Sequence, residues 1–478
     1  MLKKNHLKYI ICFLSGAATG LTLLFPLFGP AVFVLAVPVF ALLLKNVKRF
    51  WICFTFCIGL CSTGYFPAFY IRPGFGPVIT FFIDLLVYSV VGLLHSFILA
   101  IALWSGLTLA KRGWLKCIYT PLLWALAEWL IGSGTFAWPT LRLSLALWKY
   151  PALIQWASVG GQLLVSAIII AINMLLALSL CNIKNRRAIF SAIAAALVFT
   201  VNLLPYAFTD TKENKKINAV LVQPGVTVVG EDRGDVYIRA LELCEKAAEL
   251  KPDIILVSES VLPFSFEEDE YLKKEWADIA KSAKADVIIG GRLNGHAAAF
   301  HFNPKGELEA IAPKRREVPL FENGVGDRKF RPFPDNTPNI LATEKADMGL
   351  MICYESMFSV IPRNAARNGA TLLSVITNDS WFDHNTAKNL HLAHGVYRAV
   401  ETGRPLIQSG INGRTAAVSS DGIITHILGS SSGEILNAPI SLETRNTPYI
   451  IWGDCWVIIA TIFLGVLILL KTKLKKAP

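Results

Sequence analysis

Charged residues are scarce in this 478-residue chain. Only 17% of the residues are Asp, Glu, Lys or Arg, whereas 53% are hydrophobic. A soluble globular protein has about 25% charged residues, so something other than water must solvate part of this chain. The composition therefore excludes a purely cytosolic enzyme and a disordered scaffold.

Acidic residues are almost missing from both ends of the chain. Before about Thr209 and after about Tyr449 there are nineteen lysines and arginines but only three acids, Asp84, Glu128 and Asp454. The net charge of +11 thus belongs to the flanks of apolar segments, and the middle region is acidic overall. Because no basic stripe remains for a phosphate backbone, we expect no nucleic acid partner.

Apolar runs of the length that crosses a bilayer, about 17–25 residues, recur along the chain. They lie near residues 8–24, 30–44, 50–70, 79–109, 117–134, 154–181, 188–208 and 450–471. We predict eight transmembrane helices, although the second run is short and the fourth is long. A cleaved signal peptide is the less favoured alternative, because no small-x-small cleavage site precedes the second run.

The positive charge of the short loops predicts the orientation in the membrane. One set of alternate loops and both termini hold sixteen lysines and arginines, while the other set holds only Arg72, Arg142 and Lys149. Positive loops resist translocation, so both termini should be cytoplasmic and residues 210–449 should lie outside. In a bacterium, we expect a multi-pass protein of the inner (cytoplasmic) membrane with a periplasmic domain.

From Lys215 the pattern changes to short β-rich runs separated by amphipathic helices. Strands are predicted at 217–222, 253–257, 286–289, 298–303, 308–312, 348–353, 371–377, 406–409, 415–419 and 423–427, and helices near 233–250, 269–284, 358–368 and 387–402. This pattern predicts an α/β domain in which sheets pack between helix layers. We therefore divide the chain into a membrane domain (1–209), a catalytic domain (210–447) and a final transmembrane helix with a basic tail (448–478).

Several common catalytic motifs are absent. The chain has no Gly-x-Ser-x-Gly, no glycine-rich phosphate loop and no Cys-x-x-Cys, which disfavours a serine esterase, an NTPase and a zinc or thioredoxin site. Seven of the nine cysteines lie in or beside apolar runs, where thiols behave as small hydrophobes. Among them Cys53, Cys57 and Cys61 share one helical face and should pack, whereas Cys244 is predicted to be a core residue of the α/β domain.

Three reactive side chains follow predicted strands. Glu259 comes after the run 254–257, Lys314 after the strand 308–312, and Cys353 ends the run 348–352. A cysteine needs a proton acceptor and a cationic neighbour to act as a thiolate near neutral pH. Glu259 could be that acceptor and Lys314 that cation. Singly, each residue has an ordinary explanation as a buried thiol, a helix-start carboxylate or a member of a solvated basic run.

The order Glu, Lys, Cys resembles the nitrilase (carbon–nitrogen hydrolase) superfamily, and with its membrane spans the chain resembles the apolipoprotein N-acyltransferases. The resemblance covers nearly the whole chain. Its motifs lie at 14–17, 25–29, 124–129, 377–382, 398–401, 412–415 and 447–449. It implies an α-helical membrane bundle of about eight spans plus a nitrilase-like αββα sandwich.

The resemblance also implies roles for individual residues. Cys353 would be the nucleophile, Glu259 the general base and Lys314 the cation that stabilises the oxyanion. Glu355 would support the lysine, Glu322 would belong to the active-site loop, and a backbone N–H near Tyr354 would add to the oxyanion site. The chain departs from the family's motifs at four positions, which are Ser258, Phe321, Asp383 and Arg414.

The function implied by the resemblance is acyl transfer in two steps. An acyl group would pass from a phospholipid to Cys353 as a thioester, and then to the α-amine of a diacylglyceryl-cysteine on an apolipoprotein. No cofactor or metal is implied, and the partners would be the lipid donor, the lipoprotein acceptor and membrane lipid. Two alternatives stay open: a membrane-tethered hydrolase that uses water, and a transporter with an outer sensory domain, which the few charges in the spans disfavour.

Other polar and apolar clusters have more than one interpretation. The apolar loops 261–266, 357–362 and 381–382 could meet lipid or could simply pack inside the domain. His391 and His394, with His384 and Asp383, have metal-like spacing, but the helix is amphipathic and no fourth ligand is evident, so we predict no metal. Asp84, His95 and Glu128 lie in or near the predicted spans, where ionisable residues usually have a function. Asp84 and Glu128 could equally lie near the interface.

Overall fold

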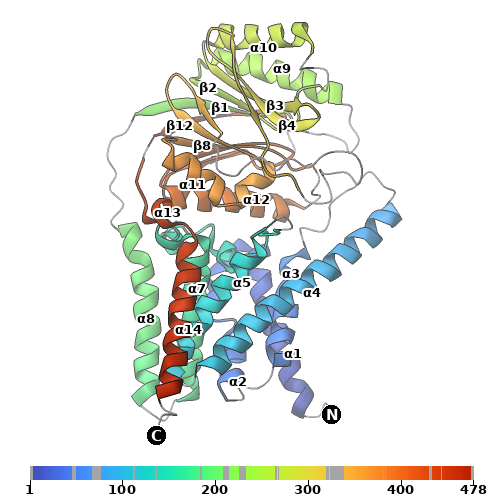
Figure 1. The fold of residues 1–478 in the computed structure, drawn as a ribbon. Helices are drawn as coiled ribbons and strands as arrows, with labels where there is room; N and C mark the ends of the chain where they lie inside the picture. The colour runs from blue at the N-terminus through green and yellow to red at the C-terminus, as the bar shows by residue number, and fades with distance from the viewer. Residues whose placement is uncertain are drawn as a thin grey trace. The chain divides into compact units, whose positions relative to one another are not determined.

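The structure is a computed structural model of the chain (Figure 1). It describes residues 4–45, 50–66, 77–110, 113–134, 137–182, 186–207, 215–225, 233–263, 266, 268–318, 322, 339–380, 382, 384–429, 433–442 and 444–474. The chain divides into two units. One comprises Met1–Thr209 with Trp452–Pro478, and the other comprises Asp210–Ile451.

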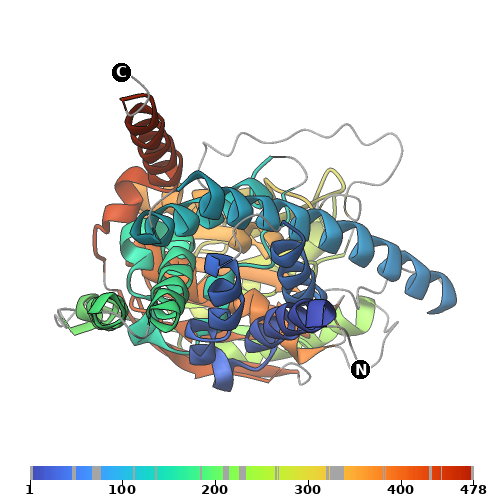
Figure 2. The same cartoon turned by 90° about the horizontal axis from the view of Figure 1, so that it is seen from below.

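The first unit is helical. Its helices are α1 (Lys4–Leu24), η1 (Pro26–Phe33), α2 (Val37–Lys45), α3 (Phe50–Gly64), α4 (Pro77–Leu109), α5 (Gly113–Ile131), η3 (Leu143–Leu147), α6 (Pro151–Ile154), α7 (Ala157–Cys181), α8 (Arg186–Ala207) and α14 (Cys455–Leu474). Seen from below (Figure 2), α7 lies among its contact partners α2, α5 and α8.

Each predicted apolar run contains a helix, but the helices differ in length and apolarity. Within the described residues, four helical stretches are long and apolar enough to cross a membrane: His6–Leu24, Pro26–Lys45, Phe81–Leu109 and Ala157–Cys181. Phe50–Gly64, Ala188–Val201 and Cys455–Leu467 are apolar but shorter. The predicted count of eight spans is therefore not confirmed. Cys53, Cys57 and Cys61 are buried together, as predicted for packing residues.

Buried polar side chains hold irregular backbone in the helical unit. Glu128 on α5 is 2% exposed, and its Oε1 accepts hydrogen bonds from the Trp124 indole (2.9 Å) and from the backbone N–H of Leu143 (3.0 Å). Helix α7 is interrupted at Gly160 and Gly161, where the backbone angles are not helical. Backbone carbonyl groups at this interruption lack their hydrogen-bond partners within the helix. The indole N–H of Trp456 on α14 donates to the Gly160 carbonyl at 3.0 Å.

The second unit contains two six-stranded sheets. The first has the order β12-β1-β2-β3-β4-β5 and the second has the order β11-β10-β9-β8-β7-β6. The strands of the first are β1 (Lys216–Gln223), β2 (Ile254–Val257), β3 (Asp286–Leu293), β4 (His296–Phe302), β5 (Leu308–Pro313) and β12 (Glu434–Ser441). The strands of the second are β6 (Ile340–Ala342), β7 (Asp347–Ile352), β8 (Leu372–Asn378), β9 (Leu406–Ile411), β10 (Ala416–Val418) and β11 (Ile424–Ile427).

Helices cover the outer faces of the two sheets, so this unit has four layers (Figure 1). Helices α9 (Arg233–Glu249) and α10 (Glu270–Ala283) pack on the first sheet, while α11 (Val360–Arg367) and α12 (Asn385–Thr402) pack on the second. Successive side chains of β2 point to opposite faces of the sheet, which explains the layering. Ile255 and Val257 join the core under α9 and α10. Ile254 and Leu256 join the core between the two sheets. Cys244 lies in the core under α9, as predicted.

The predicted strands and helices of this unit are confirmed, with two additions. The sequence interpretation missed β12, which pairs antiparallel with β1 from residue 216 paired with 441 to residue 223 paired with 434. It also missed the three-residue strand β6. In addition, β3 continues to Leu293 and forms a hairpin with β4 through Asn294 and Gly295, both with positive φ angles.

Candidate active site

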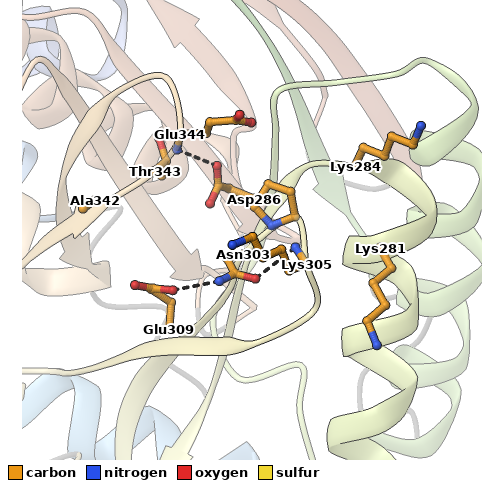
Figure 3. A pocket seen from close by; sticks show the side chains of 10 residues that line it. Lys281, Lys284, Asp286, Asn303, Lys305, Glu309, Ala342, Thr343 and Glu344 are labelled. Atoms are coloured by element: carbon orange, nitrogen blue, oxygen red, sulfur yellow. Dashed lines mark hydrogen bonds between the residues drawn. The ribbon is translucent and has the colours of Figure 1, made fainter.

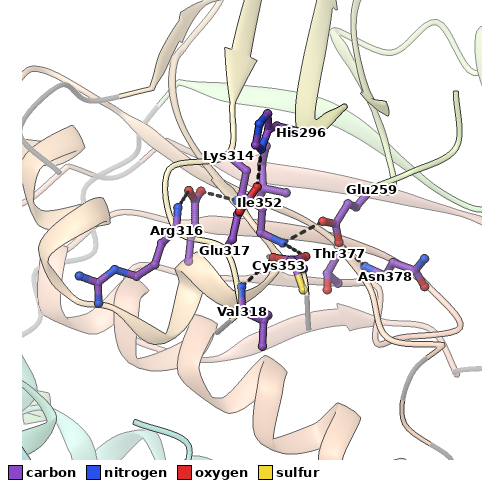
Figure 4. Close-up of polar contacts among 12 residues, drawn as sticks. Glu259, His296, Lys314, Arg316, Glu317, Val318, Ile352, Cys353, Thr377 and Asn378 are labelled. Atoms are coloured by element: carbon purple, nitrogen blue, oxygen red, sulfur yellow. Dashed lines mark hydrogen bonds and ion pairs between the residues drawn. The ribbon is translucent and has the colours of Figure 1, made fainter. Parts of the chain in front are cut away.

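Strand topology brings the three reactive residues together. Strands β2 and β3 are parallel, and β5 runs in the same direction because two antiparallel pairings separate it from β3. The C-terminal ends of β2 and β5 therefore lie on the same side of the first sheet. Glu259 lies just past the end of β2 there, and Lys314 directly follows β5. Cys353 follows β7 in the second sheet. Figure 4 shows that the three side chains converge.

Lys314 forms the centre of a buried ion-pair group. Its Nζ lies 3.0 Å from Oε1 of Glu259 and 2.7 Å from Oε1 of Glu322. The second oxygen of Glu259 accepts the backbone N–H of Asn378 at 2.9 Å, which ties the base to the end of β8. Glu259 is 4% exposed and Lys314 is 2% exposed. A lysine buried this deeply requires such partners, and here it has two carboxylates.

Cys353 occupies a strained turn at the start of a short 3₁₀ helix, η4 (Cys353–Met357). Its φ angle is +52°, in the left-handed region that residues other than glycine seldom adopt. Cys353 is partly exposed, whereas Glu259 and Lys314 are buried. Cys353 is therefore the most exposed residue of the three, although its thiol is desolvated.

The charges around the thiol define its resting state. Burial and the negative charge of Glu259 raise the pKa of Cys353 well above its usual value, while Lys314 opposes this shift. Burial lowers the pKa of Lys314, but Glu259 and Glu322 outweigh it and hold that pKa well above the usual range. Lys314 therefore stays cationic and the resting thiol stays protonated, so deprotonation must accompany nucleophilic attack.

The two supporting glutamates act on different parts of the site. Glu322 contacts the Lys314 ammonium directly, and its Oε2 accepts the backbone N–H of Val318 at 2.7 Å. Glu355 instead accepts backbone N–H groups from both sides of the site: Ile352 at 2.8 Å, Arg316 at 3.1 Å and Arg315. Glu355 thus supports the loop that carries the lysine and the turn that carries the cysteine.

Tyr354 is buried beside Cys353. Its ring packs edge-to-face on Phe358 with centroids 4.9 Å apart, and the Arg316 guanidinium lies 3.9 Å from the centroid of the Phe358 ring. These contacts fix the turn after Cys353. The role of the Tyr354 backbone N–H in binding the oxyanion stays a prediction.

A close backbone contact positions the base. An added Cβ at Gly290 on β3 would lie 2.4 Å from the Cα of Glu259, so only glycine lets the chain after β2 pass there. The Gly290 N–H donates to the Ser258 carbonyl at 3.1 Å, and the Gly290 carbonyl accepts the N–H of Val261 and of Leu262 at 3.0 Å. The turn that carries Glu259 is therefore fixed to the neighbouring strand.

The sequence interpretation missed a further pair, His391 on α12 and Asp379 after β8. Nδ1 of His391 lies 2.7 Å from Oδ1 of Asp379, and Nε2 lies 3.0 Å from both the Cys353 carbonyl oxygen and Ser356 Oγ. The thiol, carboxylate and imidazole donor atoms lie within 4.8 Å of one another. Both ring nitrogens therefore have hydrogen-bond partners within the protein.

Comparisons with known proteins give matches to both units. Residues 219–447 match the carbon-nitrogen hydrolase family, and residues 15–175 match the apolipoprotein N-acyltransferase N-terminal domain. An apolipoprotein N-acyltransferase from Gloeobacter violaceus is 27% identical over 75% of this chain and 73% of its own length. One from Thermotoga maritima is 25% identical over 74% of this chain and 70% of its own length. The chain is thus similar to apolipoprotein N-acyltransferases over about three quarters of its length.

Solved structures also resemble the α/β unit. A carbon-nitrogen hydrolase from Helicobacter pylori G27 is 18% identical, covers 48% of this chain and 91% of its own, and has a TM-score of 0.38. An amidase from Nesterenkonia sp. is 18% identical, covers 49% of this chain and 94% of its own, and has a TM-score of 0.39. The sequence matches, and not these structural likenesses, support an acyltransferase enzyme.

Two departures from the apolipoprotein N-acyltransferase motifs have structural explanations. The Ser258 hydroxyl lies 2.9 Å from the Ser409 hydroxyl on β9 and 3.2 Å from the Val222 carbonyl, so it links the two sheets directly behind Glu259. Arg414 donates from Nε to Oδ1 of Asn389 on α12 at 2.8 Å. Phe321 and Asp383, the other two departures, lie outside the described residues.

Lipid contact is not supported for the apolar loops. Val261, Leu262, Phe266, Met357 and Phe358 are all less than 9% exposed. They form part of the domain's own packing, which is the simpler of the two interpretations that the sequence left open. Phe264 and Trp381 lie outside the described residues.

A pocket of about 780 Å³ lies elsewhere on the α/β unit (Figure 3). Lys281, Lys284 and Lys305 line it together with acidic residues, but it shares no lining residue with the Cys353 site. Its buried acid, Asp286, already accepts from His301 Nε2 at 2.8 Å and from the Glu344 N–H at 3.0 Å. The described pocket lining therefore contains no cysteine, serine or histidine, and its buried carboxylate is already hydrogen-bonded.

Proposed function

We propose that the protein transfers a fatty acyl group from a phospholipid, through a thioester on Cys353, to the N-terminal α-amine of the diacylglyceryl-cysteine of apolipoproteins. The observation that carries this proposal is the convergence of Glu259, Lys314 and the partly exposed Cys353 in a chain whose other half matches the N-terminal domain of this family. The phospholipid donor, the thioester and the acceptor are all part of the proposal.

In the first half-reaction, the Glu259 carboxylate takes the Cys353 proton as the sulfur attacks an ester carbonyl carbon of the phospholipid. The carbonyl oxygen becomes an oxyanion, which the Lys314 ammonium stabilises. An oxyanion donor of this kind contributes about 2.7–4 kcal/mol in well-studied enzymes. The C–O bond then breaks, the lysophospholipid oxygen takes the proton back from Glu259, and the acyl thioester remains.

In the second half-reaction, the free α-amine of the lipoprotein attacks the thioester carbonyl. Glu259 accepts the proton from the attacking nitrogen, and the C–S bond breaks. The sulfur recovers that proton, so Cys353 and Glu259 return to their starting states. The same three residues serve both steps, and no cofactor is needed.

The proposal places the α/β unit on the periplasmic face of the inner membrane, with both chain termini in the cytoplasm. Only there does Cys353 meet an amine that has been translocated. A reporter that is active only outside the cytoplasm should work when it is fused near Asn214 and should fail near Lys111 or after Lys476. The opposite pattern would separate the site from its acceptor.

The decisive experiment for function is mass spectrometry of a lipoprotein N-terminus from cells with and without this protein. With the protein, we expect an added amide-linked acyl chain. Purified protein given phospholipid and a diacylglyceryl lipopeptide should produce the same amide. Release of free fatty acid without amide formation would indicate that water is the acceptor and would contradict the proposal.

A further inference from the structure

Negative charge predominates around the Cys353 sulfur. The carboxylates of Glu259, Glu322 and Asp379 each raise the pKa of the thiol by charge repulsion, whereas Lys314 lowers it. A thiolate at this position would thus face three carboxylates and one ammonium. A second positive charge near the sulfur would reduce the cost of forming the thiolate.

His391 has the hydrogen bonds of a doubly protonated ring. A carboxylate oxygen of Asp379 and the carbonyl oxygen of Cys353 are both acceptors, and they face the two ring nitrogens at 2.7 and 3.0 Å. A bond from Nε2 to the Cys353 carbonyl requires a hydrogen on Nε2, and with a second hydrogen on Nδ1 toward Asp379 the ring is the imidazolium. The Ser356 hydroxyl, also 3.0 Å from Nε2, can accept from the charged ring or donate to a neutral one. His391 is 2% exposed and Asp379 is fully buried, so water does not compete for these bonds.

We propose that His391, held as an imidazolium by Asp379, is a positioning residue that fixes the Cys353 turn and supplies a second positive charge against the thiolate. This inference rests on the proposed role of Cys353 as the nucleophile. The contact that fixes the turn is the bond from Nε2 to the Cys353 carbonyl, because Cys353 has a strained φ angle of +52° that its surroundings must maintain.

The charged groups packed around His391 favour the charged ring. Burial lowers the pKa of His391, but the charge and hydrogen bond of Asp379, the bond to the Cys353 carbonyl and the charge of Glu259 outweigh it, so the pKa is raised. The other ionisable groups facing the site are Lys314 from the end of β5, Glu322 from the following loop and Cys353 itself. The positive charge is present below the raised pKa and is lost as the pH rises through it.

Gly413 explains how Asp379 is placed. An added Cβ at Gly413 would lie 2.6 Å from Oδ2 of Asp379, so this glycine leaves room for the carboxylate. The other oxygen, Oδ1, also accepts the Thr377 hydroxyl at 2.9 Å. The carboxylate is thus held in one orientation, with Oδ1 directed at His391.

The first test measures alkylation of Cys353 by iodoacetamide from pH 5.5 to 10 in the full-length protein in detergent, with modification of each cysteine quantified by peptide mass spectrometry. In His391→Gln, we expect Cys353 to react about tenfold more slowly than in the wild type at pH 6, where the wild-type ring is charged, and the two rates to converge as the pH rises and the ring loses its proton. His394→Gln is the matched control, one helical turn along α12, and should keep the wild-type rate at each pH. His391→Lys keeps the positive charge and should react near the wild-type rate at pH 6.

The second test needs no variant. Deuterium exchange at the imidazole C2 position, followed by mass spectrometry, gives the pKa of each histidine in the native protein. We expect the pKa of His391 to exceed the ordinary value of about 6.5. A value below 6.5, or a His391→Gln rate at pH 6 equal to that of the wild type, would overturn the inference. A rate lowered by the same factor at every pH would also overturn it, because it would mean that His391 only packs the turn. Neither test uses lipid or lipoprotein, so failure of the proposed acyl transfer would show separately.

Discussion

The two units bury charged side chains in different ways. In the α/β unit, the Lys314 ammonium meets the carboxylates of Glu259 and Glu322, beside a partly exposed thiol. In the helical unit, the Glu128 carboxylate accepts hydrogen bonds from the Trp124 indole and the Leu143 N–H and interacts with the charge of Arg142, with no thiol among its described contacts. The first arrangement can move a proton and stabilise a charge, whereas the second fixes backbone geometry. A buried charge therefore indicates catalysis only when a reactive group accompanies it.

The two cysteines of the α/β unit sharpen this comparison most strongly. Cys353→Ser should reduce acyl transfer to background, a loss of about 10⁴-fold or more, because the hydroxyl has no comparable acidity or nucleophilicity at this site. Cys244→Ala should keep most of the activity, because Cys244 lies in the apolar core under α9. Turnover assays with phospholipid and lipopeptide measure both. Equal losses in the two variants would remove Cys353 from the mechanism.

Lys314→Met should lower acyl transfer about 10²–10³-fold, because the oxyanion loses its cation. It also leaves Glu259 and Glu322 without their shared partner. Lys345→Met is the matched control, since Lys345 is an exposed lysine that also pairs with an acid, Asp253. We expect the control to keep wild-type turnover. A Lys314→Met enzyme that is folded and fully active would show that the cation is not used.

Glu355→Gln should destabilise the α/β unit by about 1–3 kcal/mol, because the amide nitrogen cannot accept a backbone N–H and leaves a buried donor unpaired. Thermal unfolding in detergent, followed by tryptophan fluorescence, would show this as a lower Tm. No change in Tm would mean that the three backbone hydrogen bonds to Glu355 contribute little.

The same variant has a predicted pH dependence. Burial raises the pKa of Glu355 from 4.5 to about 7, although its backbone hydrogen bonds act in the opposite direction. A carboxyl group with a raised pKa in the folded state stabilises the fold below pH 4.5, and this contribution is lost as the pH rises to about 7. The Tm advantage of the wild type over Glu355→Gln should therefore be smaller at pH 8 than at pH 5. A difference in Tm between the wild type and Glu355→Gln that grows with pH would mean that the pKa of Glu355 is lowered in the folded state, and not raised.

The smallest effect is expected from the buried glutamate of the helical unit. In Glu128→Gln the amide oxygen can still accept from Trp124 and Leu143, so turnover should stay within about twofold of wild type. The same substitution at Glu259 should abolish acylation, since an amide cannot take the thiol proton. If Glu128→Gln instead lost activity while folded, the buried charge of the helical unit would have a role in function.

The local sequence predicts the elements of the α/β unit and the candidate triad because both depend on nearby residues. Strand patterns ending at Glu259, Lys314 and Cys353 suffice to place these side chains at strand ends. The pair of His391 and Asp379 depends instead on β7 and β8 being neighbours, which no local pattern reveals. Strand β12 was missed for a similar reason, because it is stabilised by pairing with β1, more than 200 residues earlier. The span count was less reliable because an apolar run does not define where its helix ends.

The central claim is that Cys353 carries the acyl group, and intact-protein mass spectrometry tests it most directly. After incubation with phospholipid alone, the full-length protein should gain the mass of one fatty acyl chain. Peptide mapping should locate that chain on Cys353, and neutral hydroxylamine should remove it as expected for a thioester. An acyl adduct that persists in Cys353→Ser, or one that maps to another residue, would contradict the account.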